Sequence, residues 1–163
     1  MPATIEHALL DELVLATCDV FRTMVFTEVY PATPIQGEAL RGGTNVVGTI
    51  AFTGGTSGLV VFYSTIDAAR HITGVMLGMD PSAVRDELPD AIGELTNMIA
   101  GSFRTRVAHA RRETWAISVP TVTVGSDFST RFVRNVRRTL CPFTMGDRDV
   151  FVELIVTTSA GRA

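Results

Sequence analysis

The sequence predicts an α+β fold in which a largely antiparallel sheet is covered by long helices. Two segments with helical periodicity, residues 5–30 and 85–111, enclose a β-hairpin pattern at residues 45–64. Several β-rich segments follow the second long helix, without the strand–helix alternation that a parallel sheet requires. A length of 163 residues is enough to bury a full core, so we expect residues 1–163 to form a single domain.

The first helix is expected over residues 5–30. Its apolar side chains recur at helical spacing and predict a buried stripe of Leu10, Leu13, Val14, Val20, Phe21 and Met24. Pro31 is expected to end the helix because proline disfavours helical backbone in the residue before it. Residues 31–44, rich in Pro, Gly and Thr, are expected to form a loop.

Two strands, residues 45–53 and 58–64, are expected to pair as a hairpin. The glycine-rich segment between them, residues 54–58, has the composition of a phosphate-binding loop. It lies between two strands, however, whereas a phosphate loop opens a helix, so a hairpin turn is the better interpretation. A second helix follows, with Ser64 or Thr65 as its cap and Gly78 at its end.

The central helix is expected at residues 85–111, with Asp86 as its cap. Its apolar residues fall within one stripe about 80° wide, made of Leu88, Ile92, Leu95, Ile99 and Phe103. The opposite, solvent face is expected to carry Asp90, Gly93, Glu94, Asn97, Gly101 and Arg104. Glycine inside a helix costs about 1 kcal/mol relative to alanine. The two glycines therefore suggest that another molecule approaches this face closely.

The last third of the chain is expected to be mostly β. Residues 115–124 are β-rich, and Pro120 confines this segment to an edge strand or splits it. Residues 131–141 and 150–157 are expected to form two further strands, with a turn at Gly146.

Composition excludes several classes of function. The formal charge is −3, which argues against nucleic-acid binding. All 14 basic residues are Arg, so Schiff-base enzymes and Walker-type phosphate loops are excluded. Four of these Arg lie in residues 130–139; a phosphate-contacting stripe is one interpretation, but net acidity favours a solvated strand face.

Metal and membrane sites are not expected either. The three histidines, His7, His71 and His109, show no metal-ligand spacing. No apolar run approaches the roughly 20 residues that span a bilayer. The start of the chain has no signal-peptide pattern, so a cytoplasmic protein is expected, with Cys18 and Cys141 as reduced buried thiols.

Glu94 and Asn97 are three residues apart, so they project side by side from the predicted solvent face. Spacing alone gives such a pair no function. Two segments, Glu94-Leu-Thr-Asn97-Met-Ile-Ala-Gly101 and Val119-Pro-Thr-Val-Thr-Val-Gly125, together resemble the CheX branch of the CheC/CheX/FliY family of chemotaxis phosphatases. The first helix and the hairpin also fit that family, in the expected order.

The resemblance implies a phosphatase that hydrolyses the aspartyl phosphate of a CheY-like response regulator. Asn97 would position the attacking water, and Glu94 would pair with the regulator's phosphate-contacting Lys. Asp90, Gly93, Gly101 and Arg104 would contact this partner. Mg²⁺ would belong to the partner, with no cofactor on this chain, and a homodimer is implied.

CheC proteins carry two Glu-x-x-Asn helices, but the first helix here has no such pair. One site per chain is therefore expected, as in CheX. The residues leave a second possibility, a non-catalytic module that binds a receiver domain or a flagellar partner. The presence of both Glu94 and Asn97 favours the enzyme.

Overall fold

The computed structural model describes residues 3–37, 43–126 and 135–158. Within these residues, eight strands form one sheet in the order β1-β7-β8-β4-β3-β5, with β2 also paired to β7 and β6 to β3. Every pairing is antiparallel, which confirms the predicted fold class. The strands are β1 (Tyr30–Pro31), β2 (Ile35–Gln36), β3 (Val46–Thr53), β4 (Ser57–Ser64), β5 (Ala116–Ile117), β6 (Thr121–Val124), β7 (Val136–Met145) and β8 (Arg148–Thr157).

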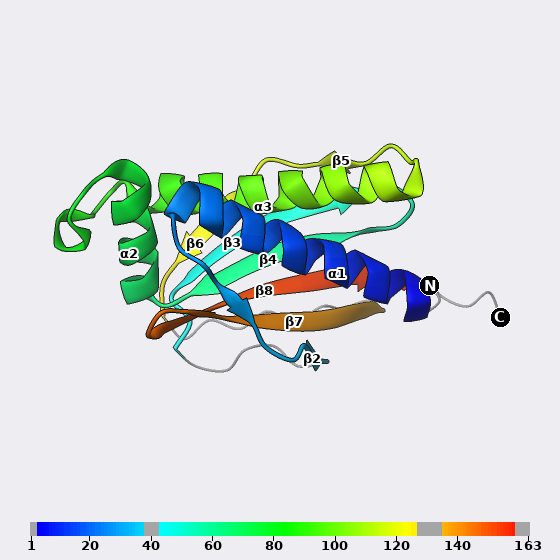
Figure 1. Ribbon diagram of the computed structural model, residues 1–163, viewed down its shortest axis with the longest axis horizontal. Coiled ribbons are helices and arrows are strands. Elements are labelled where there is room, and N and C mark those ends of the chain that lie inside the picture. Colours follow the sequence, from blue (N-terminus) through cyan, green and yellow to red (C-terminus); the bar gives the residue numbers. More distant parts are fainter. Residues whose placement is uncertain (1–2, 38–42, 127–134, 159–163) are drawn as a thin grey trace.

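Two long helices cover one face of this sheet. They are α1 (Ala3–Val20), which continues as a π-helical turn (Phe21–Val25), and α3 (Leu88–Arg111). The two helices pack against each other, and α3 also contacts β3 and β6 (Figure 1). The shorter α2 (Ile66–Leu77) and a 3-10 turn (Pro81–Ala83) precede α3, and α2 lies against it. No helix among the described residues is long and apolar enough to cross a membrane.

The main core lies between the sheet and the two long helices. Alternate residues of each strand point toward the helices, because side chains on a strand alternate between faces. The predicted apolar stripe of α3 is confirmed, since Leu88, Ile92, Leu95, Ile99 and Phe103 are all buried. Toward the C-terminal end of α3, the ring of Phe103 packs edge-on against Phe52 of β3 and against Trp115, with ring centroids 5.5 Å and 6.4 Å apart. Burying each such large side chain contributes about 1.5–3 kcal/mol, so the helix is firmly held on the sheet.

The opposite face of the sheet carries a second buried cluster, made of Val61, Tyr63, Leu140 and Ile155. Glu153 of β8 lies among them, wholly buried, and its carboxylate accepts hydrogen bonds from the Tyr63 hydroxyl at 2.8 Å and from Arg138 at 2.8 Å. Burial and the neighbouring carboxylate raise the pKa of Tyr63. A buried charge of this kind is tolerated only when it is paired and hydrogen-bonded, as it is here.

This network corrects the expectation of a solvated arginine face on β7. The Arg138 side chain is only 11% exposed and serves the buried Glu153, while Arg137, on the helix side, pairs with Glu6 of α1 at 2.6 Å. The sequence could not show these partners because they lie on distant segments. The other two arginines of the run, Arg131 and Arg134, lie outside the described residues.

The first helix ends earlier than Pro31. Its π-helical turn closes at Phe26, whose backbone is left-handed (φ 52°) and whose N–H donates to the Phe21 carbonyl. Tyr30 and Pro31 then pair with β7, so the expected loop contains two short strands. Proline is acceptable there because β1 is an edge strand, where a missing N–H does not break the ladder.

Other boundaries agree more closely with the sequence. The hairpin turns between β3 and β4, as expected. Thr65 caps α2 by accepting from the Ala68 N–H, and Gly78 ends the helix in left-handed backbone. The expected cap of α3 is wrong, because the helix begins at Leu88 after Glu87 and has no side-chain cap. Pro120 splits its segment, leaving β5 and β6 on either side.

Candidate functional site

The solvent-facing side of α3 carries most of the residues expected to form the site. Asp90, Glu94 and Arg104 are exposed, and Asn97 and Gly101 are half-buried. Glu94 and Asn97 are one helical turn apart, as are Asn97 and Gly101, so the three positions form one continuous strip. Within the described residues, the side chains of Glu94 and Asn97 make no hydrogen bond or ion pair. Both groups are therefore available to another molecule.

The two glycines of α3 have different surroundings. A Cβ at Gly101 would meet no atom within 4 Å, so this position is bare backbone beside Asn97. Gly93, by contrast, is buried, and a Cβ there would lie 3.4 Å from Val122 and 3.8 Å from Pro120. The expectation that Gly93 lies on the solvent face is therefore wrong. Its close neighbours belong to its own chain: Val122 of β6 and Pro120, the residue before that strand.

A close contact with β3 sets the height of α3 above the sheet at this site. Gly48 of β3 lies directly beneath Thr96, and a Cβ at position 48 would stand 2.1 Å from the Thr96 Oγ1. Thr96 is wholly buried and donates its hydroxyl to the Ile92 carbonyl at 2.7 Å, so it has little freedom to move. Because Thr96 immediately precedes Asn97, this contact fixes the position of the Asn97 backbone.

Ion pairs hold the other half of α3 against α1. Arg106 lies between two carboxylates of α1, pairing with Glu12 at 3.5 Å and with Asp19. The Arg106 side chain is 31% exposed, so each pair is worth at most about 1 kcal/mol. The helix α3 is therefore held in place along its length, by β3 and β6 near the Glu94–Asn97 pair and by α1 further on.

The chemistry available on this strip is that of positioning. The Asn97 amide both donates and accepts hydrogen bonds, so it can hold a water molecule in a fixed orientation. The Glu94 carboxylate can pair with a cation on another molecule. Within the described residues, no His, Cys, Asp and Glu side chains gather into a group of three or more that could hold a metal ion. The buried Cys141 is no nucleophile, because desolvation raises its pKa to about 12.

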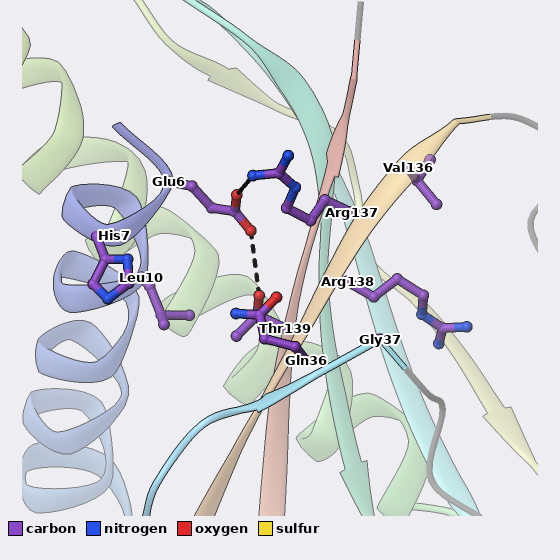
Figure 2. A pocket seen from close by; sticks show the side chains of 9 residues that line it. All are labelled: Glu6, His7, Leu10, Gln36, Gly37, Val136, Arg137, Arg138 and Thr139. Atoms are coloured by element: carbon purple, nitrogen blue, oxygen red, sulfur yellow. Dashed lines mark hydrogen bonds and ion pairs between the residues drawn. The ribbon is translucent and has the colours of Figure 1, made fainter. Parts of the chain in front are cut away.

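A cavity of about 430 Å³ lies elsewhere, between the start of α1 and strands β2 and β7. Figure 2 shows the Glu6 carboxylate pointing toward Arg137 and Thr139 inside it. Within it, the charges of Glu6 and Arg137 pair with each other. The lining of the cavity includes none of the residues of the α3 strip. The site expected from the sequence and this cavity are separate features.

The family model for chemotaxis phosphatase CheX matches residues 46–144 of the chain. This range includes β3, α3 and β6, the three elements that form and support the Glu94–Asn97 strip. The chain belongs to the CheX family.

Relatives of this CheX-family chain agree with the match. CheY-P phosphatase CheX from Thermotoga maritima is 32% identical over 84 residues, which are 51% of this chain and 54% of that protein. The match thus spans about half the length of this curated relative. CheX from Desulfovibrio desulfuricans has a TM-score of 0.80 at 24% identity, covering 91% of this chain and 99% of the other. CheX in the CheX–CheY–BeF3–Mg complex from Borrelia burgdorferi has a TM-score of 0.75 at 18% identity, covering 91% and 97%.

Sequence reasoning missed two residues that position the site in this CheX-family chain, Gly48 and Thr96. The hairpin pattern placed Gly48 in a strand, and a glycine inside a strand often marks close approach of another backbone. That signal was present, but it could not name Thr96 as the neighbour, because the contact joins residues 48 positions apart.

Proposed function

We propose that this CheX-family protein is a phosphatase that hydrolyses the aspartyl phosphate of a CheY-like response regulator. The observation that carries the proposal is the strip on α3: Glu94 and Asn97 side by side, without partners among the described residues, next to bare backbone at Gly101. The names of relatives support it, since one is a CheY-P phosphatase and another was solved with CheY, beryllofluoride and Mg²⁺.

Asn97 orients the attacking water in this proposal. An acyl phosphate has a good leaving group and a loose transition state, so catalysis depends on placing water in line with phosphorus more than on a strong base. An amide suits this task because it donates and accepts without bringing negative charge to the phosphoryl oxygens. Thr96, locked against Gly48, holds the Asn97 backbone in place during this step.

Glu94 docks the regulator by pairing with the Lys that contacts its phosphate. The exposed carboxylate is one helical turn before Asn97, so the pair would align phosphorus with the bound water. Gly101 leaves room for the partner's backbone one turn beyond, while Asp90 and Arg104 lie at the two ends of the strip.

The catalytic Mg²⁺ is proposed to belong to the regulator, so this chain would contribute only the amide and the carboxylate. A homodimer is proposed from the family resemblance, and its mass in light scattering would test it. A dimer with one strip per chain would present two independent sites.

Decay of the phosphorylated regulator tests the proposed activity. CheY-like receiver domains of the source organism are phosphorylated with acetyl phosphate, separated from excess donor, and followed with and without catalytic amounts of this protein. We expect at least one receiver domain to lose phosphate faster, with many turnovers per molecule of enzyme. Binding without acceleration would instead identify a docking module.

A further inference from the structure

One arginine of the α3 strip has no partner within the described part of its own chain. Arg104 is exposed, and its side chain forms no hydrogen bond or ion pair with any described residue. Other arginines of the same helix are neutralised, since Arg106 pairs with two carboxylates of α1 and Arg111 pairs with Glu113 at 3.2 Å. The charge of Arg104 is therefore available to another molecule.

Helix geometry directs Arg104 toward Asn97. The two residues are seven positions apart, which places them about 10 Å apart along α3 and within about 20° of the same direction. Helical side chains lean toward the N-terminus of their helix, so the Arg104 side chain covers the preceding turn. Gly101 lies in that turn, and a Cβ there would meet no atom within 4 Å. No side chain at position 101 thus stands between the guanidinium group and the Asn97 amide.

The other charges of the strip are unfavourable for a phosphorylated partner. Asp90 and Glu94 are exposed carboxylates on the N-terminal side of Asn97, and the whole chain has a formal charge of −3. A phosphoryl group beside Asn97 would lie about one helical turn, roughly 5 Å, from the Glu94 position. Like charges at this separation repel each other, so the carboxylates alone would favour the unphosphorylated partner. A cation on the far side of Asn97 reverses this preference, and Arg104 is in that place.

We propose that Arg104 recognises the phosphoryl group of the regulator and makes docking depend on phosphorylation. This inference rests on the proposed function, which supplies the partner and places its phosphorus at Asn97. A guanidinium group is always charged, and its N–H groups match the oxygens of a phosphoryl group. The phosphoryl charge is present both before and during hydrolysis. Arg104 therefore stabilises the bound state and the transition state alike, which lowers KM more than it raises kcat.

The test compares Arg104→Gln and Arg104→Lys with Arg112→Gln as a matched control. Arg112 follows the last residue of the same helix; it is also exposed, and its side chain forms no ion pair with any described residue. It lies about 22 Å from Asn97 along the helix, beyond the roughly 16 Å radius of a standard interface of about 800 Å² per partner. A general effect of charge would appear at both positions, whereas phosphoryl recognition would appear only at Arg104.

Binding of CheY-like receiver domains is measured in two states, with Mg²⁺ alone and with beryllofluoride and Mg²⁺. Fluorescence anisotropy gives the Kd of the loaded domain, and chemical-shift titration of an isotopically labelled domain gives the weaker Kd of the unloaded one. The ratio of the two values measures selectivity for the phosphoryl mimic. Circular dichroism, light scattering and turnover of the phosphorylated domains are measured on the same proteins.

We expect Arg104→Gln to raise the Kd of the loaded domain and the KM about tenfold, which corresponds to about 1.4 kcal/mol. The Kd of the unloaded domain should stay within about twofold of the wild type, because it carries no phosphoryl charge for Arg104 to bind. Arg104→Lys keeps the positive charge, so its Kd for the loaded domain should lie within about threefold of the wild type. Arg112→Gln should match the wild type in both states.

Four results would overturn the inference. The first is an unchanged Kd of the loaded domain in Arg104→Gln, and the second is an equal rise of both Kd values, which would assign Arg104 to another part of the regulator. The third is an equal loss in Arg104→Lys or in Arg112→Gln, because a local charge at position 104 would then not be the cause. The fourth is a changed oligomeric state of Arg104→Gln, which would assign Arg104 to contact between copies of the chain.

The outcomes also separate this inference from the proposed function. If the wild type prefers the loaded domain through Arg104 but does not accelerate loss of phosphate, the phosphatase proposal fails and the role of Arg104 in docking holds. If the wild type accelerates loss of phosphate while Arg104→Gln keeps both Kd values, only the Arg104 inference fails. A wild type that binds loaded and unloaded domains equally, or binds neither, would also overturn the Arg104 inference.

Discussion

Gly48→Ala is expected to disturb the proposed site without changing any residue of the polar strip. The added Cβ would stand 2.1 Å from the Thr96 Oγ1, and real Cβ atoms essentially never come closer than 3.0 Å to such a neighbour. Thr96 and the β3 backbone must therefore separate by at least 0.9 Å, the difference between these two distances. The Thr96 side chain cannot relieve the clash by rotating alone, because its Cγ2 and Cβ are also close, at 3.2 and 3.1 Å.

The displacement has two measurable consequences. Overpacking a core contact costs about 1–3 kcal/mol, which for a chain of this size lowers Tm by roughly 2 to 12 °C. A misplacement of about 1 Å in a positioning group reduces the rate about a hundredfold. Since Asn97 follows Thr96 directly, we expect Gly48→Ala to lose most of its phosphatase activity while remaining folded. Thermal unfolding followed by circular dichroism, and turnover of a phosphorylated CheY-like receiver domain, measure the two effects.

A second substitution tests whether this contact is the cause. Thr96→Ala removes both Oγ1 and Cγ2, so Gly48→Ala combined with Thr96→Ala should recover stability and part of the activity relative to Gly48→Ala alone. The double-mutant cycle should show coupling of at least 0.5 kcal/mol. Wild-type Tm and wild-type turnover in Gly48→Ala would contradict this prediction, because they would show that the contact between Gly48 and Thr96 does not determine the position of Asn97.

Three further predictions concern single residues. Glu94→Ala should raise the regulator concentration for half-maximal rate at low salt, and high salt should reduce the difference from the wild type, because an exposed ion pair is screened; equal kinetics at low salt would contradict the pairing. Gly101→Leu should fold with a free energy of unfolding equal to or up to about 1 kcal/mol above that of the wild type, since the position is open. It should nevertheless fail to bind a CheY-like receiver domain loaded with beryllofluoride and Mg²⁺, as measured by fluorescence anisotropy. Normal binding would show that the α3 strip is not the docking surface. Arg138→Met should lower the free energy of unfolding in urea by about 3–5 kcal/mol, because the Glu153 carboxylate would remain buried with only the neutral Tyr63 hydroxyl as its partner. A decrease below about 1 kcal/mol would mean that Arg138 does not stabilise the buried carboxylate.

The sequence predicted what depends on local pattern. Helical spacing from Leu88 to Phe103 was enough to orient α3, because one apolar stripe must face the core. The same pattern placed Glu94 and Asn97 together in solvent. It failed at Gly93, which the pattern put on the polar face: a residue without a side chain gives no polar or apolar signal, and its burial depends on Pro120 and Val122 of a distant segment.

Partners that are distant in sequence could not be predicted. Arg138 looked like a solvated strand residue because neither Glu153 nor Tyr63 is near it in the local pattern. Likewise, the early end of the first helix at Phe26 follows from backbone geometry that an aromatic residue seldom adopts. In both cases tertiary packing outweighs local preference, and the contacts responsible are visible only in the folded structure.

The most direct test of the proposed mechanism is single-turnover dephosphorylation by Asn97→Ala, with binding of the beryllofluoride-loaded receiver domain measured on the same protein. Asn97 is a half-buried surface residue without a partner among the described residues, so the variant should fold with wild-type stability. Losing one transition-state contact of this kind costs about 3 kcal/mol, a rate factor of about a hundred. We expect that loss of rate, with the Kd for the loaded receiver domain within about threefold of the wild type. Near-wild-type dephosphorylation by Asn97→Ala would contradict it.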